Sequence, residues 1–493
     1  MKHYSHHIPD SLTLVLSGSL LLAGGCLSVG PDYIPPETPA VMGWSTALNS
    51  GVTSGATDQK ALSRWWTVFN DPALAALMEC ARTNNLDLRQ AEGRLREARA
   101  QRGIARADRF PTLGASGSAS QGQSSKESGT GTSSEHFSAS LDASWELDFF
   151  GKKRRALESA DATLQASQED LHDTLVSLLA EVALDYVDIR SYQMRLTISE
   201  TNLIAQSDTY NIARWRREAG LTTQLDEDQA RLSLEQTRAE IPTLQTGLAK
   251  AKYQLSVLMG QPPGTQGEAL ANRKAIPVAP TELAIGVPAD LLRRRPDVRR
   301  AERQLAVQTA QIGVAAAARY PSFSLAGSIG LESLAFHNLF TVGARTATAA
   351  ADAAWTLIDG GRIEQGIAVQ TAKQEQALNL YKATVLTAFL DVENALVANA
   401  NERTRRRALE EAMKSGQSAF ELARDQYSSG LANFQTVLDA QRSLLSVQTQ
   451  CATSDAEVTS NMIRLYKALG GGWTALSPAV AQTNTTHSGG EIP

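Results

Sequence analysis

"LDLRQAEGRLREARAQRGIARADRFP" (residues 86–111) aligns without a gap on "PDVRRAERQLAVQTAQIGVAAAARYP" (residues 296–321). The shift between the two stretches is 210 positions, and the same shift carries Gly220 onto Gly430 (430 − 220 = 210). A constant shift over so many positions indicates an internal duplication. Because each repeat must bury its apolar face against a neighbour, the duplication decides what kind of fold to expect.

The composition excludes several classes of function. Only 20% of the 493 residues are charged, the formal net charge is −5, and basic residues are scattered, so no nucleic-acid partner is expected. Three of the seven histidines (His3, His6 and His7) lie at the N-terminus and the others are isolated. There is no GxSxG elbow, HExxH motif, phosphate loop or group of metal ligands. The sequence therefore predicts no catalytic residues, no metal and no cofactor.

Three cysteines are too few for a disulfide framework. A pairing of Cys80 with Cys451 stays open, although buried free thiols are the favoured interpretation.

The N-terminus has the pattern of a secretory signal. "SLTLVLSGSLLLAGGC" (residues 11–26) is an apolar run followed by small residues and Cys26. This ending resembles a bacterial lipobox, although Ala23 replaces the preferred leucine. It predicts removal of residues 1–25 and lipidation of Cys26, which would attach the protein to a membrane without spanning it. An ordinary cleavage site beside an unrelated cysteine is the alternative.

Each copy of the repeat contains the same order of periodic segments. A helical stretch (near 72–110 and 288–319) ends at a proline, and two segments of period-two alternation follow, as in "HFSASLDASWELD". Helical periodicity then runs for nearly 70 residues to Gly220 or Gly430, and a second helix follows. The expected domains are a signal peptide (1–25), a lipid-anchored segment (26–71), a first repeat (72–260, strands 112–120 and 137–147), a linker (261–287), a second repeat (288–472, strands 322–331 and 346–357) and a disordered tail (473–493).

The alternating segments have the length of membrane-spanning barrel strands, typically about 9–11 residues. Four strands cannot close a barrel, and open edges are not tolerated in lipid. The strands therefore predict an oligomer that shares one barrel, with two or three subunits both possible from spacing alone. A soluble β-sandwich layer is the alternative. Each long helix would measure roughly 100 Å and must lie against other helices.

Several stretches resemble the TolC family of outer-membrane efflux lipoproteins, in its OprM/NodT branch. They are "CLSVGPDYIPPETPAVMGW", "GVPADLLRRRPDVRRAERQLAVQTAQIGVAAAARYPSFSL" and "YSSGLANFQTVLDAQRSL", within a match over nearly all of residues 26–473. The resemblance implies an α+β fold in a homotrimer, with a shared twelve-stranded β-barrel in the outer membrane and an α-helical tunnel in the periplasm.

The resemblance also implies a passive duct for small molecules such as drugs, not an enzyme. Its implied partners are a periplasmic adaptor protein and an inner-membrane transporter of the resistance-nodulation-division (RND) kind. A duct for type I protein secretion is the alternative. A purely helical lipoprotein such as an adaptor is disfavoured, because it has no need of the four strands.

The resemblance assigns a periplasmic gate to Asp439, which would form a ring with its two symmetry mates. Tyr427 and Arg442 match positions that hold the tip closed through hydrogen bonds and ion pairs. Other TolC-family gate residues are absent, since Ala432 and Thr436 replace an arginine and an aspartate, so closure is expected to depend on Arg442 and on the "DED" of residues 226–228. Taken alone, without the family resemblance, Asp439 is better explained as an ordinary solvated helix acid.

Four further residues complete the predicted sites. Gly220 and Gly430 are expected to cap helices at hairpin tips, which would dock an adaptor. Trp145 and Trp355 fall near strand ends, where either an interfacial aromatic belt or plain packing would explain them.

Overall fold

The computed structural model describes residues 28–37, 43–46, 52–53, 55, 59–129, 131–265, 270–280, 283–285 and 294–473. Cys26, the predicted signal peptide and the chain beyond Trp473 lie outside the described residues. The chain divides into two compact units, which are described one at a time: unit 1 (Met1–Pro36, Arg94–Gln168, Arg300–Lys382) and unit 2 (Glu37–Gly93, Glu169–Arg299, Ala383–Pro493).

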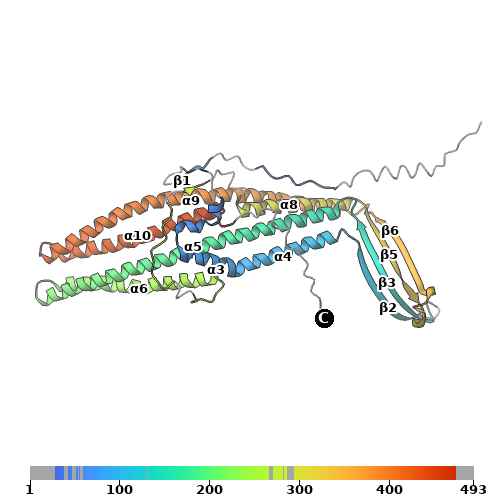
Figure 1. The fold of residues 1–493 in the computed structure, drawn as a ribbon, viewed down its shortest axis with the longest axis horizontal. Coiled ribbons are helices and arrows are strands. Elements are labelled where there is room, and N and C mark those ends of the chain that lie inside the picture. The colour runs from blue at the N-terminus through green and yellow to red at the C-terminus, as the bar shows by residue number, and fades with distance from the viewer. Residues whose placement is uncertain are drawn as a thin grey trace, which may run out of the picture. The chain divides into compact units, whose positions relative to one another are not determined.

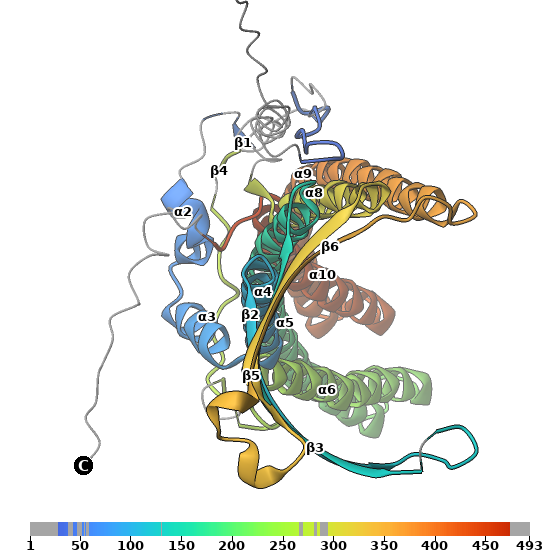
Figure 2. The same ribbon diagram turned by 90° about the vertical axis from the view of Figure 1, so that its right-hand side faces the viewer.

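Unit 1 contains an antiparallel sheet with the strand order β2-β3-β5-β6. Its strands are β2 (Thr112–Gln123), β3 (Ser133–Leu147), β5 (Ser322–Ser333) and β6 (Arg345–Ala354). Figure 1 shows them side by side, and Figure 2 shows that the sheet is curved. Two short 3-10 turns, η3 (Phe336–Asn338) and η4 (Val342–Ala344), link β5 to β6. β5 starts directly after Pro321, which has no N–H to donate, and its first residue pairs with the last residue of β6.

The two faces of this sheet differ in chemistry because side chains alternate along each strand. One face is apolar and open to the surroundings, with Leu113 74% and Ile329 62% exposed. The other face carries serines and threonines that bond across the strands, such as Ser116 Oγ with Ser140 Oγ (2.9 Å) and Ser328 Oγ with Thr348 Oγ1 (2.7 Å). An exposed apolar face that extends over several strands is suited to contact with an apolar environment.

A repeated contact closes the turn from helix to strand in each copy. The indole Nε1 of Trp145 donates to the carbonyl O of Arg109 (3.0 Å), and that of Trp355 donates to Arg319 O (3.0 Å). These carbonyls follow α4 (Leu86–Ala107) and α8 (Pro296–Ala316), whose last C=O groups have no partner within the helix. Each tryptophan therefore fixes the foot of a strand pair to the helix that precedes it.

Unit 2 contains the main hydrophobic core. Trp65, in the 3-10 helix η1 (Trp65–Phe69), is 1% exposed and stacks on Tyr466 with ring centroids 5.4 Å apart. Most of this core comes from α3 (Pro72–Asn84), α5 (Lys152–Glu218), α6 (Gln224–Leu258), α9 (Arg362–Ser428) and α10 (Phe434–Ala468), of which α5 and α9 begin in unit 1. Leu62 of α2 (Gln59–Ser63) and Leu88 of α4 are also buried in it. Short pieces complete the described elements: α2, the 3-10 turn η2 (Ala317–Arg319) after α8, and the parallel pair β1 (Val52–Thr53) and β4 (Leu283–Ala284).

The helical stretch that the sequence predicts over 72–110 is two helices in the structure. Asn85 separates α3 from α4, because its side-chain Oδ1 accepts from Leu88 N (2.9 Å) and caps the second helix. The same side chain donates from Nδ2 to Leu258 O at the end of α6 (3.0 Å). At the equivalent place in the second copy, Arg295 Nη1 donates to Ala468 O (3.1 Å). The duplication has kept this link between helix ends with different residues.

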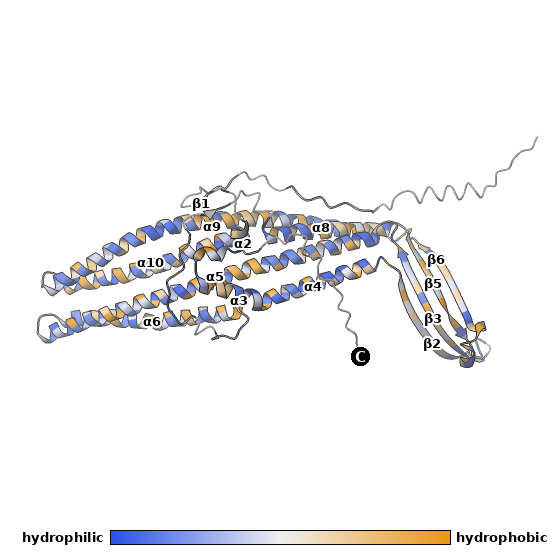
Figure 3. Ribbon diagram, viewed as in Figure 1, coloured by the Kyte–Doolittle hydropathy of each residue, from blue (hydrophilic) through white to orange (hydrophobic). Residues whose placement is uncertain are grey.

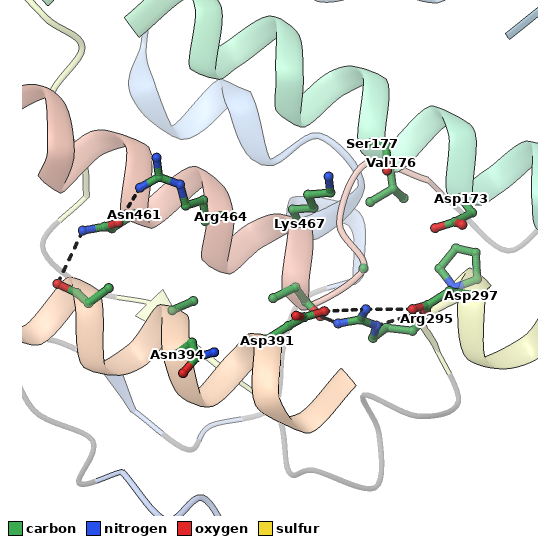
Figure 4. Close-up of a pocket in the computed structure, with 15 residues that line it drawn as sticks. Asp173, Val176, Ser177, Arg295, Asp297, Asp391, Asn394, Asn461, Arg464 and Lys467 are labelled. Carbon is green, nitrogen blue, oxygen red and sulfur yellow. Dashed lines mark hydrogen bonds and ion pairs between the residues drawn. The ribbon is translucent and has the colours of Figure 1, made fainter. Parts of the chain in front are cut away.

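Arg295 also forms one wall of a cavity of about 500 Å³ within unit 2 (Figure 4). Its guanidinium bonds to Asp297 (2.7 Å) and Asp391 (2.9 Å), so its charge is matched although only 9% of the residue is exposed. Lys467 and Arg464 of α10 line the same cavity. The lining thus combines both signs of charge.

Trp473 does not belong to the tail in which the sequence interpretation placed it. It is 6% exposed, its ring stacks on His172 (4.4 Å between centroids), and the guanidinium of Arg299 lies 5.3 Å from the ring centroid. Burial of a large aromatic ring in this contact holds the chain until residue 473.

Within the described part of the chain, no helix has the length and apolar character needed to cross a membrane. The same residues contain no group of His, Cys, Asp and Glu side chains that could hold a metal ion. Cys80 and Cys451 are both free thiols, and burial raises the pKa of Cys451.

Candidate functional site at the tips of two helical hairpins

Two hairpins of unit 2, α5–α6 and α9–α10, turn at the left of Figure 1. Gly220 and Gly430 have φ of 71° and 75°, the left-handed region that L side chains rarely adopt. At the first tip Leu221 N bonds to Arg216 O (2.8 Å), and at the second Leu431 N bonds to Gln426 O (2.8 Å). This six-to-one hydrogen bond after a left-handed glycine is the Schellman arrangement, which satisfies the last carbonyls of a helix.

The two hairpins meet in an apolar cluster just behind the turns. Its largest members are Tyr427 at the end of α9 and Phe434 at the start of α10, with ring centroids 5.3 Å apart. The buried members of this tip cluster are Ala213, Ala230, Ala423, Tyr427, Phe434, Val437 and Leu438. Since members come from all four helices, the cluster joins one hairpin to the other.

Arg216 of the first hairpin lies over Tyr427 of the second. Its guanidinium carbon is 4.5 Å from the centroid of the tyrosine ring, and Nη1 donates to Tyr427 O (3.2 Å). A cation over an aromatic face contributes about 0.5–2 kcal/mol, depending on desolvation. The sequence interpretation missed Arg216, whose repeat counterpart is the neutral Gln426 (216 + 210 = 426). The basic run before Gly220 was the only signal that could have indicated it.

Tyr427 acts here through its ring and carbonyl, not through its hydroxyl. The hydroxyl is buried and has no hydrogen-bond partner within the described part of the chain. Burial raises the pKa of Tyr427, and the nearby positive charge of Arg216 opposes this effect. The described residues of a single chain therefore do not form the hydrogen bond expected from the family resemblance.

Asp439 is exposed on α10, directly after Leu438 of the tip cluster. Its Oδ1 accepts from Gln435 Nε2 (2.9 Å), and no ion pair to it is formed by the residues that the structure describes. Arg442 is also exposed and, in the same residues, has no hydrogen bond or ion pair. Between them Gln441 is 1% exposed, and both polar atoms of its amide lack partners. The acid and the arginine thus face outward from a helix whose buried side retains unused hydrogen-bonding capacity.

The acidic triplet 226–228 serves its own hairpin. Asp226 accepts from Thr223 N (3.5 Å) in a capping box at the start of α6. Glu227 forms an ion pair with Arg217 at the end of α5, and Asp228 accepts from Gln224 Nε2 (3.1 Å). The structure therefore connects this triplet to the first tip and not to Arg442.

The predicted belt residues lie in unit 1, apart from the tip cluster. Trp145 and Trp355 are 38% and 59% exposed, so their rings are largely accessible although each indole N–H is bonded. Cys26 lies outside the described residues.

A family model for outer membrane efflux proteins matches residues 77–261 and again residues 287–471. The two matches are separated by 210 positions at both ends (287 − 77 and 471 − 261), which is the shift of the internal repeat. The chain belongs to the outer membrane efflux protein family. It is an outer-membrane efflux channel of the TolC-like, duplicated type.

Relatives of this efflux protein align along almost the whole chain. Nodulation protein T of Rhizobium leguminosarum bv. trifolii is 34% identical over 93% of this chain and 97% of its own length. The probable efflux pump outer membrane protein TtgC of Pseudomonas putida is 32% identical over 93% of this chain and 95% of its own length. These names favour efflux over the alternative of protein secretion.

Solved channel structures have the same fold as this efflux protein. The outer-membrane channel OprN gives a TM-score of 0.85 at 34% identity, covering 90% of this chain and 99% of that one. CusC, described as forming a transmembrane channel, gives 0.78 at 29% identity, covering 90% and 100%. The α+β fold expected from the resemblance is thereby confirmed.

Proposed function

We propose that this efflux channel is the trimeric exit duct of a tripartite system, in which an inner-membrane RND transporter and a periplasmic adaptor deliver small molecules to it. The observation that carries the proposal is the combination, in one chain, of a sheet with one open apolar face and two long helical hairpins. The duct performs no chemistry in this proposal. Its substrates are small organic molecules such as drugs, in keeping with the relatives named for toluene and antibiotic efflux.

The proposed oligomer is supported by the edges of the sheet, and its threefold symmetry by the resemblance to the TolC family. Among the described residues, β2 and β6 each pair on one side only. In lipid, each unpaired backbone group costs several kcal/mol, so these edges need partners. Three copies joined edge to edge give a closed twelve-stranded barrel, with the polar serine face toward the lumen. Trp145 and Trp355 then stand at the foot of the barrel, as an aromatic belt at the membrane interface.

The hairpin tips are the proposed adaptor-docking surface and the proposed gate. Three copies of Asp439 around a threefold axis form a ring that repels itself and attracts cations. Tyr427 and Arg216 hold the second hairpin against the first, and Arg442 supplies the exposed positive charge nearest to Asp439 in sequence. Gly220 and Gly430 present the two turns to the adaptor.

The N-terminus is the second membrane attachment in this proposal. Acylation of Cys26 after removal of residues 1–25 would add a lipid anchor in the outer membrane. The channel would thus hold to the membrane through both its strands and a lipid.

Single-channel conductance of the purified protein in planar lipid bilayers tests the duct and the gate separately. Wild type is compared with Asp439→Ala and with Gln229→Ala, the repeat counterpart of Asp439 (439 − 210 = 229). The expected result is conductance in all three, with a weaker cation preference or larger conductance only in Asp439→Ala. An absence of conductance in every protein would contradict the duct. Identical behaviour of all three would remove Asp439 from the gate and leave the duct intact.

A further inference from the structure

The described chain begins with a segment, Ser28–Tyr33, that is bound tightly to unit 1. The amide of Val29 donates to Phe150 O (3.1 Å), in the link between β3 and α5. We call residues 28–33 the N-terminal strap. It follows Cys26 by two residues in the sequence, so its binding site decides where the proposed lipid anchor leaves the protein.

Arg155, in the first turn of α5, makes most of the polar contacts with this strap. Its Nε donates to Val29 O (3.1 Å), and Nη2 donates to Gly30 O (3.2 Å) and to Asp32 Oδ1 (2.7 Å). Nη1 pairs with Glu158 on the same helix (2.7 Å). The residue is only 4% exposed, and a buried guanidinium is tolerated only when its donors are matched in this way.

Glycines let the backbone of the strap lie directly against two other backbone segments, one at Gly151 and one at Gly313. A Cβ added at Gly30, where φ is 88°, would fall 2.4 Å from the Cα of Gly313 on α8. One added at Gly313 would fall 2.7 Å from Cγ of Arg155 and 2.9 Å from Val29 O. One added at Gly151 would fall 2.9 Å from the Cα of Ser28. No side chain fits between these segments, so the strap has a specific seat.

The far end of the strap is fixed by a second pair of contacts. The hydroxyl of Tyr33 donates to Glu302 Oε1 (3.0 Å), and the guanidinium of Arg303 lies 5.6 Å from the centroid of its ring. Both partners are on α8, so the strap bridges the beginning of α5 and the length of α8.

The equivalent pair of elements, the start of α9 and α4, offers no such seat in the described part of the chain. At the shift of 210, the counterpart of Arg155 is Gln365 (365 − 155 = 210). The counterpart of Gly151 is Gly361 (361 − 151 = 210), and that of Gly313 is Gly103 (313 − 103 = 210). An added Cβ at Gly103 or Gly361 would meet nothing within 4 Å. The strap site is therefore an addition to the duplicated architecture, built from α5 of the first copy and α8 of the second.

The residue that accepts the hydrogen bond of Val29, Phe150, belongs to a group of aromatic side chains at the strand feet. Phe150 stacks on Tyr320 (4.6 Å between centroids), and Phe149 contacts Phe323 edge-on (5.2 Å). Aromatic side chains at the feet of strands favour the boundary between lipid and water. The strap therefore begins at the level of the proposed membrane interface.

From these contacts we propose that Arg155 is a positioning residue that fixes the N-terminal strap at the foot of the sheet, so that the lipid on Cys26 enters the same interface as the strand feet. The proposal rests on the lipid anchoring proposed above. In this proposal, contacts within the protein fix the place where the lipid anchor leaves it, and insertion of the lipid into the membrane does not.

Hydrogen exchange of the strap amides, measured by mass spectrometry on the full-length acylated protein in lipid nanodiscs, tests this assignment. The variants are Arg155→Gln, Gly313→Ala and the unacylated Cys26→Ser. The matched control is Gly103→Ala, which adds the same methyl at the open counterpart of Gly313. We expect exchange at residues 29–33 to rise roughly tenfold or more in the first two variants, because each loses several hydrogen bonds or the seat itself. Wild type, Cys26→Ser and Gly103→Ala should keep the strap protected, and Arg155→Lys should restore protection in part through Asp32.

Two results would overturn the proposal. One is unchanged strap exchange in Arg155→Gln, and the other is loss of protection in Cys26→Ser alone, which would assign the position to the lipid. Single-channel conductance of the same variants separates this question from the duct, because all of them should still conduct. A variant that does not fold would lose both conductance and protection along α5, and Gly313→Ala then provides the second route to the same result.

Discussion

At the scale of single residues, the tip site combines side chains that the sequence could indicate with others that it could not. Asp439 and Tyr427 could be predicted as gate residues because the stretch of sequence around Gly430 resembles a known family. Arg216 lies 211 positions from Tyr427, and only the packing of two hairpins brings its guanidinium over the tyrosine ring. A cation–aromatic contact between two hairpins leaves no characteristic spacing in the sequence, so it could not be predicted from the sequence.

Asp185 on α5 leads to a prediction about pH. Burial raises the pKa of Asp185 to about 7, and the charges of Asp188 and Glu181 add to the effect. Its Oδ2 is buried with no partner within the described residues. Because the unfolded chain loses this proton near pH 4 and the folded chain only near pH 7, the contribution of Asp185 to stability falls as the pH rises between these values.

We expect Asp185→Asn to be more stable than wild type at pH 8 and to differ little from it at pH 4. The thermal unfolding midpoint across this range, followed by circular dichroism, measures the difference. Asp208→Asn, an exposed acid on the same helix, serves as the control and should change neither value. A constant offset between Asp185→Asn and wild type at every pH would argue against the raised pKa.

At the scale of elements, the strands and long helices could be predicted because period-two and helical periodicities extend over whole segments. The ends of helices and strands were harder to predict from the sequence, since they depend on contacts with segments elsewhere in the chain. Asn85 divides one predicted helix into two because its side chain caps α4 and bonds to the end of α6. Trp473 was assigned to a tail because the residues that follow it are rich in Ser, Thr, Gly and Pro, whereas its contacts are with His172 and Arg299.

The hairpin turn of the second copy gives a prediction at this scale. In Gly430→Ala the added Cβ meets no neighbour, so the cost comes from the left-handed backbone alone, about 1–2 kcal/mol. Gly366→Ala, within α9 and also with open space around it, should instead stabilise the helix by about 0.5–1 kcal/mol.

Denaturant unfolding of both alanine variants, followed by the helical signal at equal protein concentration, measures these opposite shifts. If Gly430→Ala were as stable as wild type, the left-handed turn would not be required by the hairpin.

At the scale of the whole molecule, the apolar face of the sheet determines how the protein meets its surroundings. Ile329 is 62% exposed on that face, while its neighbour Ser328 points to the opposite face and bonds to Thr348. A lysine on a lipid-facing strand costs about 2–4 kcal/mol at the bilayer midplane, whereas a lumen-facing one is tolerated. We therefore expect Ile329→Lys to impair insertion into the membrane and Ser328→Lys to insert like wild type.

Refolding into phospholipid vesicles, with the protease-resistant fraction as the readout, compares the two lysine variants. A stronger defect in Ser328→Lys than in Ile329→Lys would reverse the assignment of the two faces.

The sequence by itself determined the duplication, the order of helices and strands, the alternation of the strand faces and the family, because each of these is written in local periodicity or in a constant shift of 210 positions. Only the tertiary structure decided which distant residues contact each other: Arg216 with Tyr427, Arg295 with Asp391, and Arg155 with the N-terminal strap. The physical reason is the same in each case. A charged side chain is buried, wholly or in part, only where distant segments supply acceptors or an aromatic face, and no local pattern records which segments those will be.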